Sequence, residues 1–123
     1  MVENPELRPG AEDVGVVLAA LADPTRRQLL DALVDVGRAS ATTLAGRLPV
    51  SRQAVVKHLQ VLEIAGLVTG VRAGREVLYS ARPAPLTASA RWLSELSATW
   101  DRRLNAVKQA AESTQSSPAI RLD

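Results

Sequence analysis

The chain contains no cysteine, a single histidine (His58) and very few aromatic residues. The absence of cysteine excludes disulfides, thiolate zinc sites, iron–sulfur clusters and cysteine nucleophiles. A single histidine also excludes a metal site built from two or three histidines of one chain. We therefore expect neither a metal nor another cofactor.

Long apolar runs and a secretion signal are missing as well. No stretch of 18 apolar residues is present, so the sequence predicts no membrane span. Residues 1–9 contain acidic residues and no apolar segment of the kind that signal peptides have, so the expected compartment is the cytoplasm. Glycine-rich loops with a phosphate-binding lysine are also lacking, and we do not expect an enzyme.

The length of 123 residues fits one domain, in which charge is unevenly distributed. The net charge is only +2, but residues 24–82 carry nine basic and four acidic residues, whereas residues 1–23 carry one and five. A basic centre favours a polyanionic partner, although an ordinary charged surface would give a similar pattern.

Apolar residues at helical spacing predict a mainly helical fold with one small β-hairpin. The core is aliphatic and rich in alanine, which is typical of helices. Asp23-Pro24 and Ser51 have the chemistry of helix starts, and Gly37 and Gly66 that of helix ends. The predicted helices span residues 11–22, 24–36, 41–48, 51–65 and 86–111.

A change of period after Gly66 predicts the hairpin. Two short β-prone runs flank the segment 72–75, and we expect the tip at Ala73-Gly74. Pro83 and Pro85 then separate the hairpin from the last helix. Residues 11–112 form the domain in this interpretation, residues 1–10 a flexible arm and residues 113–123 a disordered tail.

The third and fourth predicted helices form a helix-turn-helix, and the hairpin after them a wing. The face of the fourth helix opposite its apolar stripe has no acidic residue up to Gln60. Arginine and glutamine read guanine and adenine by paired hydrogen bonds, and a small residue permits close approach to the groove. The predicted DNA contacts are Ser51, Arg52, Gln53, Ala54, Lys57 and His58 on this helix and Arg72 and Arg75 on the wing.

Each of these assignments has a simpler alternative. The helix face could be an ordinary solvated surface, and the wing arginines could protect the edge of a hairpin. His58 is either a packed, hydrogen-bonded residue or a phosphate contact, and both are favoured over metal binding or catalysis. Arg26 and Arg27 oppose the dipole of their own helix, which Asp23 and either a phosphate or an acidic neighbour would compensate.

The last helix carries an apolar stripe that a small domain has little room to bury. Tryptophan is enriched in protein interfaces, and a two-fold dimer would place two reading helices about 34 Å apart on a palindrome. We therefore predict a homodimer through the first and last helices; the alternative is packing of the two helices within one chain. The predicted interface residues are Val14, Val17, Leu18, Leu21, Trp92, Leu93, Leu96, Trp100, Leu104 and Val107.

Four segments together resemble the ArsR/SmtB family of bacterial winged-helix repressors. They are residues 21–27 (LADPTRR), 51–59 (SRQAVVKHL), 62–68 (LEIAGLV) and 74–76 (GRE). The resemblance covers about residues 12–108 and implies a homodimer that binds an inverted-repeat operator, often that of its own operon. The cysteine and histidine ligands of the metal-sensing members are missing, so the chain is similar to the metal-free branch.

The expected function is accordingly that of a sequence-specific DNA-binding repressor with double-stranded DNA as its partner and no membrane contact. A small-molecule effector is left open. The alternative is a winged-helix module that binds proteins and no DNA, because fold does not fix function.

Overall fold

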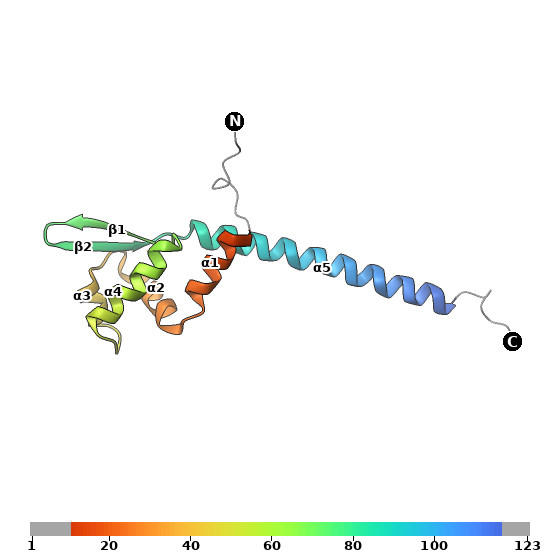
Figure 1. Ribbon diagram of the computed structural model, residues 1–123, viewed down its shortest axis with the longest axis horizontal. Coiled ribbons are helices and arrows are strands. Elements are labelled where there is room, and N and C mark those ends of the chain that lie inside the picture. Colours follow the sequence, from red (N-terminus) through yellow and green to blue (C-terminus); the bar gives the residue numbers. More distant parts are fainter. Residues whose placement is uncertain (1–10, 117–123) are drawn as a thin grey trace, which may run out of the picture. The chain divides into compact units, whose positions relative to one another are not determined.

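The computed structural model describes residues 11–116 and confirms a mainly helical fold with one antiparallel hairpin (Figure 1). Its elements are α1 (Ala11–Leu21), α2 (Pro24–Val36), α3 (Ala41–Ala45), α4 (Arg52–Ile64), β1 (Val68–Ala73), β2 (Glu76–Ala81) and α5 (Ala84–Ser116). The expected arm, residues 1–10, and residues 117–123 of the expected tail lie outside the described residues. The chain divides into two compact units after Ala90, here called the N-terminal unit and the C-terminal unit.

Side-chain caps fix the helix starts where the sequence predicts them. The Asp23 carboxylate accepts hydrogen bonds from the amides of Thr25 and Arg26, at 2.7 and 3.3 Å, and Pro24 occupies the first position of α2. The Ser51 hydroxyl caps α4 by accepting from the amide of Ala54 at 3.1 Å. Gly37 and Gly66 follow α2 and α4 with φ of 87° and 78°, which suits glycine.

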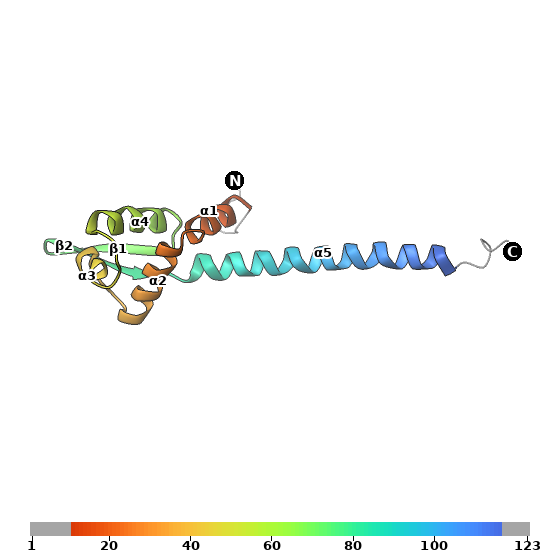
Figure 2. The same cartoon turned by 90° about the horizontal axis from the view of Figure 1, so that it is seen from below.

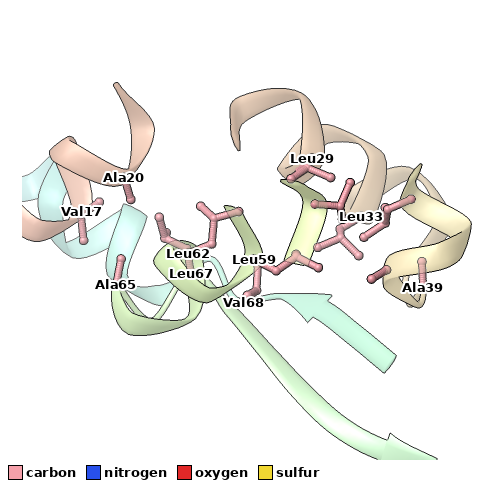
Figure 3. Packing of buried hydrophobic residues seen from close by; sticks show 13 residues of the cluster. Val17, Ala20, Leu29, Leu33, Ala39, Leu59, Leu62, Ala65, Leu67 and Val68 are labelled. Atoms are coloured by element: carbon pink, nitrogen blue, oxygen red, sulfur yellow. The ribbon is translucent and has the colours of Figure 1, made fainter. Parts of the chain in front are cut away.

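The hydrophobic core of the N-terminal unit lies between α1, α2, α3, α4 and the base of the hairpin (Figure 3). Leu29 and Leu33 of α2 are fully buried, as predicted, but Val36 is exposed because α2 ends there at the surface. The other fully buried large side chains are Leu44, Val55, Leu59, Leu62, Leu67, Val68 and Val14. Each such side chain stabilises the fold by about 1.5–3 kcal/mol through removal from water.

The hairpin is longer than expected, and its tip lies one residue further along. Ala73 pairs with Glu76, so the two-residue turn is Gly74-Arg75, and Gly74 has a φ of 66°. This conformation is the reason for the shift, because glycine adopts positive φ without strain. Ala39 and Tyr79 exchange two backbone hydrogen bonds, of 3.0 and 2.8 Å, which tie β2 to the segment before α3.

Two helices differ from the predicted lengths by more than two residues. The third ends at Ala45 instead of residue 48, and the chain continues through turns at Gly46 and Arg47. The last helix begins at Ala84, because Pro85 in its first turn needs no hydrogen-bond partner for its nitrogen. It continues through residues 113–116, so the expected tail begins too early; Thr114 bonds back to the Ala110 carbonyl at 3.0 Å and so remains compatible with a helix.

Candidate nucleic-acid interface

The helix α4 separates apolar and polar side chains onto opposite faces. Its residues Val55, Leu59 and Leu62 are buried in the core. We call the exposed set Arg52, Gln53, Lys57 and Gln60 the recognition face. Ser51 is exposed at the start of this helix and Ala54 is partly buried beside it. The recognition face carries two cations, two amides and no acid, which fits the donors and acceptors of a DNA groove.

Arg52 is tied to the preceding helix. Its Nε donates to the hydroxyl oxygen of Thr42 on α3 at 3.0 Å, in an exposed position. This bond joins the two helices of the helix-turn-helix and restricts the arginine side chain. Sequence reasoning missed Thr42, although an exposed threonine on the helix before the turn was the available signal.

The wing carries Arg72 and Arg75 in exposed positions next to the Gly74 turn. The exposed side chain of Val71 adds an apolar contact site that the sequence interpretation did not include. In both views the hairpin tip and the N-terminal end of α4 lie on the same side of the N-terminal unit (Figures 1 and 2). The turn of the wing and the first turn of α4 therefore lie on one side of the N-terminal unit.

His58 is separated from the recognition face. It is partly buried, and its Nδ1 lies 3.4 Å from Nη1 of Arg26. Of the two interpretations open from the sequence, the geometry favours the packed, hydrogen-bonded histidine.

The positive charges of Arg26 and Arg27 oppose the dipole of α2, and the end of α1 compensates them. Arg26 donates through Nε to the carbonyl of Ala20 at 2.7 Å and through Nη2 to that of Ala19 at 3.2 Å, and Arg27 donates to the carbonyl of Leu21. These carbonyls belong to the C-terminal turn of α1, where the helix dipole is negative. The expected phosphate or acidic neighbour is therefore replaced by the end of another helix.

Asp23 completes this cluster. Its carboxylate lies 3.7 Å from Nη1 of Arg26 in addition to capping α2. Desolvation works to raise the pKa of Asp23, but the amides of Thr25 and Arg26 and the nearby charges of Arg26 and His58 outweigh it, so the pKa is lowered. The charged form of Asp23 thus stabilises the junction between α1 and α2.

The predicted dimer residues fall into three groups. Val14 and Val17 are buried within this chain, so they are core residues and offer no surface to a partner, contrary to the expectation. Leu21, Trp92 and Leu96 are partly buried. The exposed members are Leu18, Leu93, Trp100, Leu104 and Val107.

Comparisons with known proteins agree with this geometry. Residues 21–71, which include α2 to α4, match the family model of a helix-turn-helix domain. The ArsR-like transcriptional regulator from Rhodococcus sp. RHA1 is 49% identical and has a TM-score of 0.74, covering 81% of this chain and 93% of that one. The chain belongs to the ArsR family.

Two relatives in this family carry functional names. The HTH-type transcriptional regulator Rv2034 of Mycobacterium tuberculosis is 39% identical over 94 residues, 76% of this chain and 84% of that protein. The transcriptional repressor SdpR of Bacillus subtilis is 32% identical over 77 residues, 63% and 84% of the two chains. The ArsR resemblance is confirmed, and the fold is that of a winged helix-turn-helix regulator of transcription.

The described part of this ArsR-family chain shows no group of three or more His, Asp or Glu side chains that could hold a metal ion. None of the helices within residues 11–116, including α5, combines the length and the apolar character needed to cross a bilayer.

Proposed function

We propose that the protein is a dimeric repressor that binds an inverted-repeat operator, including that of its own operon. The observation that carries this proposal is the recognition face, which is exposed and free of acids, on a helix whose start lies on the same side of the N-terminal unit as the hairpin tip. An α-helix fits the major groove of B-DNA, which is about 12 Å wide. In this mechanism α4 enters the major groove and its first residues reach the base edges.

The remaining groups position the helix on the duplex. Arg72 and Arg75 contact the flanking minor groove or its phosphates, where an exposed pair of cations next to glycine fits the negative potential. Ser51 and Ala54 allow the start of α4 to approach the DNA closely, and the helix dipole favours a phosphate there. The bound dimer covers the promoter and blocks transcription.

A second copy supplies the symmetry that an inverted repeat requires. The two copies of α4 would lie one helical turn apart, about 34 Å, on the same side of the duplex. The exposed apolar side chains Leu18, Leu93, Trp100, Leu104 and Val107 are the candidates for the surface that joins the copies.

A gel-shift assay with the DNA upstream of the gene tests the proposal. The wild-type protein should shift this DNA and prefer it over scrambled DNA, and Lys57→Glu should reduce binding strongly because it places an acid on the recognition face. The matched control is Lys108→Glu on α5, another exposed lysine, which should bind normally. Absence of binding at low salt would contradict the proposal and favour the protein-binding module.

A further inference from the structure

An exposed apolar stripe follows α5 at a heptad spacing. Leu86, Leu93, Trp100 and Val107 are each seven residues apart, and Leu104 lies between the last two. Residues seven apart remain on nearly the same side of a helix, with a drift of about 20° per heptad. We call these five residues the apolar stripe; all five are exposed in the single chain. A heptad stripe of this kind is the pattern by which two helices pack along each other.

The C-terminal unit offers the end of this stripe nothing to pack on. Trp100 is 56% exposed and Leu104 is 67% exposed. These two side chains and Arg103 line a small apolar hollow on the surface. A helix of 33 residues gains most of its stability in water from packing of its apolar face, so a partner for this face is required.

The N-terminal unit contains an apolar groove of about 570 Å³ between α2, the end of β2 and the first turn of α5. We call it the α2 groove. Its apolar lining includes Leu30, Val34, Leu67, Pro83 and Leu86. Val34 is 70% exposed there, which is unusual for a valine on a core helix. The groove therefore has the chemistry to receive large aliphatic and aromatic side chains.

A two-fold axis between two copies would bring the stripe of one copy to the groove of the other. Leu86 lies seven residues, or one heptad, before Leu93, and Trp100 lies the same distance after it. In an antiparallel pair of α5 helices with a two-fold axis near Leu93, the positions before and after the axis exchange. Trp100 of one copy then lies beside Leu86 of the partner, and Leu104 lies at the level of Arg82, and both of these partner residues line the α2 groove.

We propose that the α2 groove is the docking site for Trp100 and Leu104 of a second copy of this chain. Two such contacts form in one dimer, one on each side of the axis. The inference rests on the proposed dimer, but it names a surface on α2 that dimerisation by the first and last helices does not require.

The charges around the two surfaces are compatible with this contact. Asp101 and Arg103 flank the end of the stripe, on opposite sides of the helix. The rim of the groove also carries both signs, with Asp31, Arg27 and Arg82. Arg103 can therefore meet Asp31, and Asp101 can meet Arg82, so that neither approach brings only like charges together.

The absence of cysteine permits a direct test. Two full-length variants with different tags, Val34→Cys and Leu104→Cys, are co-expressed and treated with a short bismaleimide cross-linker. Because each chain carries one thiol, a covalent product with both tags reports a contact between subunits. The matched control replaces Leu104→Cys by Ala98→Cys, an exposed position away from the stripe.

The proposal predicts at least ten times more doubly tagged product from the Val34 and Leu104 pair than from the Val34 and Ala98 pair. Sedimentation equilibrium on the same samples establishes whether a dimer is present. A dimer with equal cross-linking of the two pairs would overturn the docking site and leave the proposed repressor intact. A monomer at micromolar concentration would overturn both.

Discussion

The N-terminal and C-terminal units use apolar residues at the same helical spacing but bury them differently. In the N-terminal unit Leu29, Leu33 and Leu59 are covered completely by neighbouring elements. In the C-terminal unit Trp100, Leu104 and Val107 have a comparable spacing and are mostly exposed. Periodicity therefore identifies the apolar face of a helix, whereas the tertiary fold decides whether the same chain covers it.

The largest expected effect is that salt concentration changes DNA binding by the recognition face much more than it changes dimerisation through the apolar residues. If a dimer neutralises about eight phosphates, log K for DNA falls against log salt with a slope near −7, because bound cations are released. The dimer contact is mainly apolar, so its dissociation constant should change little. Fluorescence anisotropy with labelled operator DNA and sedimentation at the same salt concentrations provide the two curves. A flat curve for DNA would contradict the role of the recognition face.

Truncation of one leucine in each unit should destabilise the protein in two different ways. Leu59→Ala leaves a cavity in the core and should lower the free energy of unfolding by about 2–5 kcal/mol at any protein concentration. Leu104→Ala removes an exposed side chain and should act only through the partner subunit, so its effect depends on concentration. Urea denaturation at two protein concentrations measures both. A large loss for Leu104→Ala that is independent of concentration would show that this leucine stabilises its own chain.

The smallest expected effect concerns acid stability at the α1–α2 junction. Because the pKa of Asp23 is lowered in the folded state, its charge stabilises the fold above the unfolded-state pKa of about 4, and this contribution disappears as the pH falls below that value. Asp23→Asn should therefore melt at a lower temperature than wild type at pH 7.

Thermal melts from pH 7 to pH 3 show whether the difference closes. The two melting temperatures should converge as the pH falls through the lowered pKa of Asp23 in the folded state, where the wild-type carboxylate becomes protonated. Asp23→Ala also removes the oxygen that caps α2, so it should retain a deficit at every pH. A constant difference between wild type and Asp23→Asn would contradict the role of the charge.

Local sequence signals predicted much of the fold because the relevant interactions are local. The caps at Asp23 and Ser51 act within three residues, and the buried stripe of α4 follows from spacing alone. The recognition face was predictable for the same reason, since it is the remainder of an amphipathic helix.

Contacts between elements were not predictable in the same way. The carbonyls that accept hydrogen bonds from Arg26 and Arg27 belong to the end of α1. They can be identified only from the way α1 and α2 pack together. The bond from Arg52 to Thr42 likewise depends on the turn between α3 and α4. Val14 lies on the same apolar face of α1 as Leu18, and only the packing shows that Val14 is buried and Leu18 is exposed.

Selection of binding sites from a random DNA pool shows whether the recognition face reads the DNA sequence. Wild type should select an inverted repeat, and Gln53→Ala should lose the base preference at one symmetric pair of positions, with about 1–3 kcal/mol of weaker binding. The matched control Gln109→Ala, on an exposed position of α5, should select the same repeat as wild type. Selection of the unchanged repeat by Gln53→Ala, with unchanged affinity, would contradict the assignment of this face to DNA.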